Sequence, residues 1–290
     1  MFDLNPYLAD GVRWIETALD RHVPSADTRP AKLHAAMRHS LFAGGKRIRP
    51  ILCAACAEAC GAMRDVALLP AAAIECLHTY TLIHDDLPCM DDDDLRRGVP
   101  TCHKVYGEAI ALLAGDALQA LAFELAARTP AAALEIVREL AIASGSTGVI
   151  GGQVEDMLGE HLPPDAARLE YIQRHKTGDL IVCACRMGVL AAGGGARALD
   201  AATRYGNAIG ETFQIADDIL NATSTAEQLG KAVGTDAARA KTTALSVYGM
   251  EGAKKRLQKL TDAAIQALPG FPGDTAPLAA LARHIAARKN

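Results

Sequence analysis

The stretch Thr79–His103 reads TYTLIHDDLPCMDDDDLRRGVPTCH, and its aspartates begin directly after an apolar run. Carboxylates this close together repel one another unless solvent or a bound cation compensates their charge. A solvated acidic loop is the simplest interpretation of the aspartates alone. Two adjacent arginines, Arg96 and Arg97, follow the acids at once, and Arg is suited to bidentate phosphate recognition. Carboxylates for hard cations beside arginines for phosphate oxygens indicate a magnesium–diphosphate site.

The rest of the chain predicts an all-α protein. Of its 290 residues, 50% are hydrophobic and only 4% are aromatic, so the core must be built mainly from Ala, Leu, Ile and Val. Ala-rich stretches at 111–127 and 131–143 favour helix. No segment alternates with period two for long enough to predict a sheet. Because the motifs must converge on one site and no linker divides them, we expect a single domain over residues 1–290.

Composition also excludes several classes of protein. A formal net charge of −4 argues against a general nucleic-acid binder. The eight cysteines lie mostly in apolar helical sequence, which favours buried, reduced thiols. The N-terminus has no basic region followed by an apolar run, and no uncharged apolar run reaches the ~18 residues that a bilayer span needs. We therefore expect a soluble cytoplasmic protein without a membrane span.

A second acidic cluster, Asp217-Asp218-Ile219-Leu220-Asn221, also stands at the end of an apolar helical stretch. Asp217 and Asn221 are four residues apart and share a helix face, with Gln214 one turn earlier. An acidic pair in a helix is commonly just a solvated face. Two such clusters opposed across a cleft, however, could hold several Mg²⁺ ions against one diphosphate.

The geometry of the first cluster is constrained by Pro88. On an ideal helix Asp85 and Asp91 would be about 120° out of phase. Proline disfavours helical geometry in the residue before it, so the helix should end or kink near Asp86 and let Asp91 return to the metals bound by Asp85. The surplus acids 92–94 are expected to act electrostatically or as caps.

Basic residues occur in separated groups, each of which could alone be a salt-bridge partner or a solvated charge. Lys46 and Arg49 follow the flexible pair Gly44–Gly45, and His78 stands two helical turns before Asp85. Their company with the acidic clusters favours phosphate contacts instead. Three further candidates are Lys176, Lys231 and Lys241.

Together these motifs resemble one family. LIHDDLPCMDDDDLRRGVPTCH, GGKRIRP, HKTG, FQIADDIL and LGK…GTD occur in the order found in short-chain trans-isoprenyl diphosphate synthases, most similarly in bacterial farnesyl diphosphate synthases. The resemblance implies an all-helical, isoprenoid synthase-type bundle around a deep central cavity, and a homodimer. It also implies roughly three Mg²⁺ ions per active site, which Mn²⁺ can replace.

The resemblance also implies roles for individual residues. Metal binding falls to Asp85, Asp91 and Asp217, with catalytic support from Asp86 and Asp218. The allylic diphosphate would contact Arg96, Lys176, Lys231 and Lys241, and isopentenyl diphosphate would contact Lys46, Arg49, His78 and Arg97. Thr177 and Gln214 would stabilise the allylic cation with their oxygens. Gln153 and Asp156 match a family element near the first metal site. Asn221 departs from the usual Asp, which puts a direct metal role at this position in doubt.

The expected reaction is head-to-tail condensation of isopentenyl diphosphate with dimethylallyl or geranyl diphosphate, giving farnesyl diphosphate and pyrophosphate. Tyr80 lies five residues before Asp85, about 7.5 Å deeper along a helix, and an aromatic ring there, beside Thr81, should limit product length. The alternatives are a geranyl or geranylgeranyl diphosphate synthase, a class I terpene cyclase, and an inactive helical subunit. The polar segment Ala222–Lys241 is expected to close over the site and exclude water.

Overall fold

The computed structural model describes residues 2–223 and 242–288. It confirms the all-α prediction, because within these residues the two short strands form one antiparallel hairpin and the remaining elements are helical. The elements are α1 (Leu4–His22), α2 (Ala31–Leu41), α3 (Ile48–Ala59), η1 (Arg64–Ala67), α4 (Leu68–Asp85), β1 (Leu95–Arg96), β2 (Val99–Pro100), α5 (Cys102–Tyr106), α6 (Glu108–Ala127), α7 (Ala133–Ser144), α8 (Val149–Leu158), α9 (Ala166–Ile172), η2 (Gln173–Gly178), α10 (Asp179–Ala191), α11 (Ala196–Thr223), α14 (Ala244–Ala267), η3 (Leu268–Gly270) and α15 (Ala276–Ala286).

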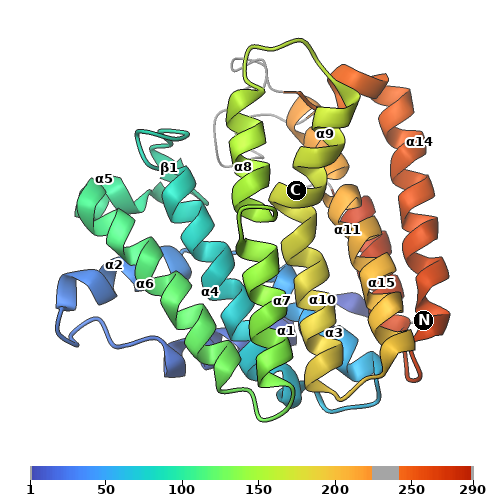
Figure 1. The fold of residues 1–290 in the computed structure, drawn as a ribbon, viewed down its shortest axis with the longest axis horizontal. Coiled ribbons are helices and arrows are strands. Elements are labelled where there is room, and N and C mark those ends of the chain that lie inside the picture. Colours follow the sequence, from blue (N-terminus) through green and yellow to red (C-terminus); the bar gives the residue numbers. More distant parts are fainter. Residues whose placement is uncertain (1, 224–241, 289–290) are drawn as a thin grey trace.

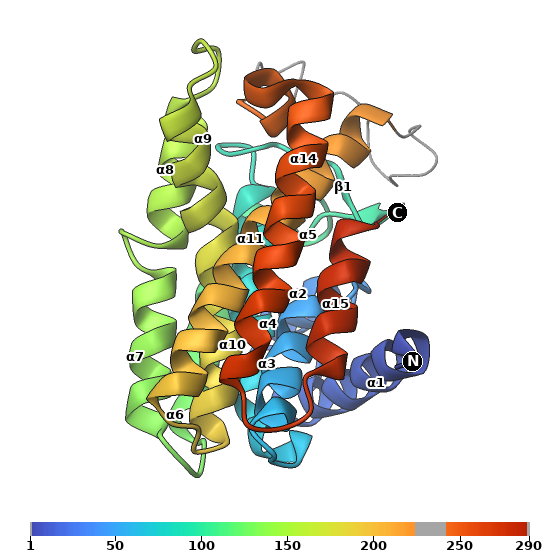
Figure 2. The ribbon, with the colours of Figure 1, turned by 90° about the vertical axis from the view of Figure 1, so that its right-hand side faces the viewer.

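The long helices lie side by side as a bundle (Figure 1). Helix α4 packs against α3, α6 and α10, while α11 packs against α14. Figure 2 shows α6 and α7 on one side of the bundle and α14 and α15 on the other. The core consists largely of Ala, Leu and Ile with few aromatic rings, as the composition predicts. Small side chains let these helices approach closely, so the bundle has a tightly packed centre.

Helix α4 carries the first aspartates to one end of the bundle. It is almost uniformly apolar and most of its residues are buried, which fits its central place. It ends at Asp85, with Asp86 as its C-cap, so the prediction of a helix end before Pro88 is confirmed. The β1–β2 hairpin lies at this end (Figure 1) and pairs Leu95 with Pro100 and Arg96 with Val99.

Two helical segments, Arg64–Asp85 and Glu108–Ala127, are long and apolar enough to cross a bilayer by length and composition. In their most apolar windows 67% and 39% of the residues are buried. A buried core helix of a helical bundle can have the same composition, and most residues of α4 are buried. The two segments therefore do not establish a membrane span.

Candidate active site

Two adjoining cavities lie beside the C-terminal half of α4. The first, called here the apolar cavity, measures about 380 Å³ and is bordered by α4, α8 and η2. The second, the basic cavity, measures about 270 Å³ and is bordered by the start of α3 together with α4, Phe213 and Arg288. Arg49 and His78 line both. A hydrocarbon chain fits the first environment and an anion fits the second.

The first aspartate cluster folds back on itself after α4 ends. The backbone N–H of Asp91 donates to the carbonyl oxygen of Asp85 at 2.8 Å, and Asp92 has a left-handed backbone with φ of 48°. The prediction that the chain returns Asp91 toward Asp85 is confirmed for the backbone. Asp85 itself lines the apolar cavity.

Burial destabilises the ionised form of Asp85. Loss of solvent raises the pKa of its carboxyl, Lys176 lowers it and the nearby Asp91 raises it, and the result is a pKa of about 6. A carboxylate held in such surroundings is stabilised by an added cation. Asp85 therefore has the electrostatic character expected of a metal ligand.

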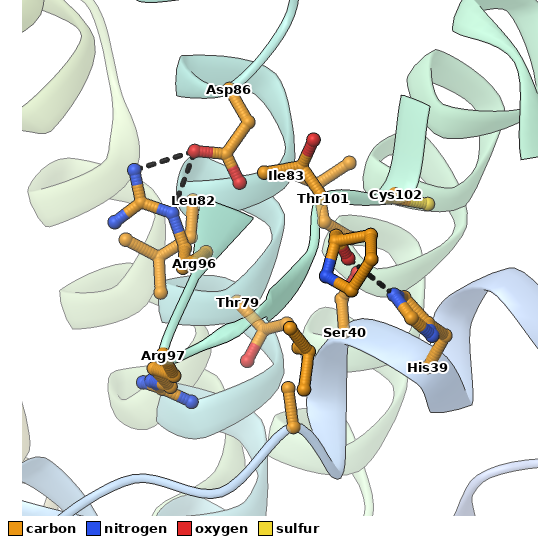
Figure 3. Close-up of a pocket in the computed structure, with 13 residues that line it drawn as sticks. His39, Ser40, Thr79, Leu82, Ile83, Asp86, Arg96, Arg97, Thr101 and Cys102 are labelled. Atoms are coloured by element: carbon orange, nitrogen blue, oxygen red, sulfur yellow. Dashed lines mark hydrogen bonds and ion pairs between the residues drawn. The ribbon is translucent and has the colours of Figure 1, made fainter. Parts of the chain in front are cut away.

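Asp86 points away from the apolar cavity and pairs with Arg96. Nε and Nη2 of Arg96 lie 2.6 and 2.5 Å from the same Oδ1 of Asp86, and Nη2 lies 3.3 Å from Asp93. Figure 3 shows this pair above the small pocket between α4 and the hairpin. The ion pair of Arg96 thus links the hairpin to the end of α4. To make its predicted phosphate contact, the Arg96 side chain would have to turn away from Asp86.

Arg97 reaches the basic cavity instead. It has a φ of 54°, and this left-handed turn sends its side chain in a different direction from that of Arg96 (Figure 3). Its guanidinium donates to the carbonyl oxygen of Gly44. A Cβ on Gly45 would stand 2.7 Å from the Arg97 guanidinium carbon, so the glycine pair makes room for this arginine.

The four residues predicted to hold isopentenyl diphosphate, Lys46, Arg49, His78 and Arg97, all line the basic cavity. Burial lowers the pKa of Arg49 to about 10, so the guanidinium stays charged at neutral pH. Burial and the neighbouring Arg49 hold the pKa of His78 well below its usual value. The neutral ring accepts from Arg49 across 3.3 Å. The positive charge of this cavity is therefore carried by lysine and arginine, while Glu75, which also lines it, is paired with Arg47.

Lys176 and Thr177 are presented by η2, a π-helical turn, a distortion that is common at functional sites. Lys176 Nζ lies 2.6 Å from Asp156 Oδ2 on α8. Helix α8 and η2 approach so closely that a Cβ on Gly152 would lie 2.2 Å from the backbone nitrogen of Lys176. Gln153 lines the apolar cavity, so the structure brings this predicted element to the site.

The second cluster is organised by hydrogen bonds across three helical segments. Thr177 donates to Gln214 Oε1 at 3.0 Å, and Gln214 Nε2 donates to Asp218 Oδ1 at 3.1 Å. Asp218 Oδ2 accepts from the backbone N–H of Ala244 at 2.7 Å. Asp218 is buried, and it connects α11 to the first residue of α14.

Arg288 is a residue of the site that the sequence patterns do not reveal. Its Nη1 lies 3.1 Å from Asp217 Oδ1, and its guanidinium lies 4.3 Å from the centre of the Phe213 ring. The side chain is 10% exposed. Its Nε has no hydrogen-bond partner in the described part of the chain, and its Nη1 makes the ion pair with Asp217 without the geometry of a hydrogen bond. A single Arg just after α15 carries no motif, so its approach to Asp217 follows only from the tertiary fold.

Lys231, Lys241 and most of the segment Ala222–Lys241 lie outside the described residues. Their predicted contacts with the allylic diphosphate, and the closure of this segment, stay predictions.

The donor atoms fit Mg²⁺ in a particular way. Within residues 2–223 and 242–288, no group of three or more His, Cys, Asp or Glu side chains is close enough to hold a metal ion. Mg²⁺ commonly takes only one or two carboxylates, completing its shell with water and substrate phosphates. The half-buried Asp85 beside Asp91, with Asp217 on α11, provides oxygen donors of this kind.

Comparisons with known proteins agree with the fold. A family model described as polyprenyl synthetase matches residues 30–269. The chain belongs to the polyprenyl synthetase family, and it is a trans-prenyltransferase of isoprenoid biosynthesis. The resemblance seen in the sequence is thereby confirmed.

Individual members of the family are similar to the chain over most of its length. The chain is 44% identical over 299 residues to geranylgeranyl pyrophosphate synthase 9 (chloroplastic) of Arabidopsis thaliana, covering 100% of this chain and 82% of that protein. An FPP/GFPP synthase from Zymomonas mobilis has a TM-score of 0.86 and 37% identity, covering 97% of this chain and 98% of that one. A geranylgeranyl pyrophosphate synthetase from Pyrococcus horikoshii has a TM-score of 0.88 and 28% identity, with 98% of both chains covered.

Proposed function

We propose that the protein condenses isopentenyl diphosphate with allylic diphosphates and that its principal product is geranylgeranyl diphosphate. The observation that carries the condensation is the adjacency of an apolar cavity, with Asp85 and Lys176 in its wall, and a basic cavity that shares Arg49 and His78 with it. The names of the Arabidopsis relatives favour the geranylgeranyl product over the farnesyl product expected from the sequence.

Farnesyl diphosphate is the second candidate product, and Tyr80 favours it. Its ring is 6% exposed and lines the apolar cavity on the same helix as Asp85. A large ring at this depth shortens the space open to a growing chain. The Zymomonas neighbour is called an FPP/GFPP synthase, so its name covers farnesyl diphosphate and a second product.

The residues of the two cavities would bind different substrates. Asp85, Asp91 and Asp217 would hold Mg²⁺, which when bound neutralises the allylic diphosphate and makes it a better leaving group. Lys176 would exchange its contact with Asp156 for a phosphate oxygen. The basic cavity binds the diphosphate of isopentenyl diphosphate and directs its double bond toward the apolar cavity.

Thr177 and Gln214 are placed to support the allylic cation. Their hydrogen bond turns the Thr177 hydroxyl toward Gln214, which fixes the neutral oxygen dipole of Thr177 at the wall of the apolar cavity. Fixed dipoles stabilise a developing charge without reorganising during the reaction. The apolar side chains Val149, Val154 and Leu180 line the same cavity and exclude water that would quench the cation.

We also propose that the protein acts as a homodimer. Leu112 and Leu113 on α6 are 47% and 51% exposed, and α6 is an apolar helix with much of its surface uncovered. An exposed apolar helix face of this kind is typical of an interface. Analytical ultracentrifugation should give a dimer, and Leu113→Glu should give a monomer; a wild-type monomer at micromolar concentration would contradict the proposal.

Product chromatography tests the function. The protein is incubated with Mg²⁺, isopentenyl diphosphate and, separately, dimethylallyl, geranyl or farnesyl diphosphate. A geranylgeranyl synthase elongates all three, whereas a farnesyl synthase leaves farnesyl diphosphate unchanged. Tyr80→Ala should lengthen the main product in either case. Folded protein that elongates none of the three would overturn the proposal.

A further inference from the structure

His84 precedes the first metal-binding aspartate of the proposed site, and its side chain lies between α4 and α6. Its Nε2 donates to the carbonyl oxygen of Leu112 at 3.0 Å. The imidazole also lines the apolar cavity. One edge of the ring is therefore fastened to α6 while another faces the space that would receive the growing chain.

Tyr80, one turn earlier on α4, depends on this imidazole for its position. The two rings meet edge to face, with centroids 5.6 Å apart and planes at 78°. The Tyr80 hydroxyl is buried and has no hydrogen-bond partner among the described residues. Because no hydrogen bond orients the phenol, packing against its neighbours fixes the ring, and His84 is the aromatic neighbour.

Gly115 on α6 provides the space that His84 occupies. A Cβ at this position would lie 2.1 Å from His84 Nε2 and 2.5 Å from Cδ2, a distance that forces the ring to move. Glycine inside a helix costs about 1 kcal/mol relative to alanine, so its presence in the middle of α6 needs a packing reason. The imidazole supplies that reason.

We propose that His84 and Gly115 together set product length. Gly115 leaves the space that the imidazole of His84 occupies, and the imidazole keeps the Tyr80 ring in position across the apolar cavity. The inference rests on the proposed prenyl elongation and names two specificity-determining positions for it. It also gives opposite directions for two substitutions. Removing the ring enlarges the cavity and frees Tyr80, while a methyl group at 115 drives the ring away from α6 into the cavity.

The experiment is a double-substitution cycle read by product chromatography. His84→Ala should lengthen the main product by one isoprenyl unit relative to wild type, and Gly115→Ala should shorten it by one unit. The double variant should behave as His84→Ala alone, because the added methyl group then has no ring to displace. His84→Gln keeps a donor for Leu112 and much of the volume, so its product should stay close to that of wild type.

The control is Gly195→Ala, where a Cβ meets nothing within 4 Å, and its product should be unchanged. Each variant is also assayed for thermal melting and for the KM of isopentenyl diphosphate, which a role confined to chain length leaves within about twofold. Unchanged product length in both single variants, or a Gly115→Ala effect that persists without His84, would overturn the inference. A wild-type protein that makes no prenyl product would instead overturn the proposed function.

Discussion

The two aspartate clusters differ in how the fold organises them. The first interrupts a helix: α4 ends at Asp85, and the following loop bends back so that Asp91 bonds to the Asp85 carbonyl. The second lies within the continuous helix α11, and its surroundings come from distant segments, namely the start of α14 and Arg288. One cluster is shaped by its own sequence and the other by tertiary contacts.

In both clusters, however, the two adjacent aspartates have different surroundings. In each pair the second aspartate is engaged in the scaffold: Asp86 pairs with Arg96, and Asp218 binds Gln214 and the Ala244 N–H. The first aspartate of each pair faces the site, Asp85 at the apolar cavity and Asp217 beside Arg288. We infer that adjacent carboxylates in this protein serve different purposes, one toward the ligand and one toward the fold.

The largest expected effect is that of Asp85→Ala. Losing a half-buried carboxylate that would hold the metal should lower kcat/KM by about 1,000-fold or more, in the range seen when a main electrostatic stabiliser is removed. The melting temperature should not fall, because the substitution removes a partly desolvated charge. Steady-state kinetics with geranyl diphosphate, together with a thermal melt, check both parts. Near-normal kcat/KM would remove Asp85 from the metal site.

Arg288→Ala, beside Asp217 of the second aspartate cluster, should have the next largest effect on kinetics. Losing a buried guanidinium from the basic cavity should raise the KM for isopentenyl diphosphate about tenfold or more, since a hydrogen bond to a charged group contributes about 1.5–3 kcal/mol. The KM for the allylic substrate should change little. Arg283→Ala, at an exposed position on the preceding helix α15, is the matched control. Equal KM effects of the two variants would show that Arg288 has no special place in the cavity.

The pH dependence of metal binding tests the role of the first aspartate cluster. Because burial raises the pKa of Asp85 to about 6, its carboxyl is protonated below that pH and must lose the proton to bind Mg²⁺. The apparent Mg²⁺ affinity should therefore fall as pH drops through 6, by up to about tenfold per pH unit below it. The raised pKa also means that ionising Asp85 disfavours the unliganded fold as pH rises from 4 to 6. Titration calorimetry between pH 5 and 8 measures the affinity, and a flat profile would contradict the assignment.

Asn221→Asp should have the smallest effect. The substitution restores the acid usual in this motif, but Asn already offers a carbonyl oxygen on the face of Asp217. We expect kcat to change by less than about threefold. A loss comparable to that of Asp85→Ala, in purified and folded protein, would refute this ranking.

The sequence predicts the local features of the site and misses those created by packing. The end of α4 follows from Pro88, and the sharing of one cavity by Lys46, Arg49, His78 and Arg97 follows from the family resemblance. Arg288 could not be predicted, because its contact with Asp217 joins α11 to the segment after α15 through the tertiary fold. The opposite directions of Arg96 and Arg97 depend on a left-handed backbone at Arg97, for which Arg as a residue type gives no signal.

The division of labour within each aspartate pair has one direct test. Calorimetry would measure Mg²⁺ uptake in the presence of an unreactive allylic diphosphate analogue for Asp85→Asn, Asp86→Asn, Asp217→Asn and Asp218→Asn, with thermal melts alongside. The account predicts that Asp85→Asn and Asp217→Asn lose metal uptake and keep their melting temperature. It predicts that Asp86→Asn and Asp218→Asn melt at lower temperature and still take up metal. The reverse assignment in either pair would contradict it.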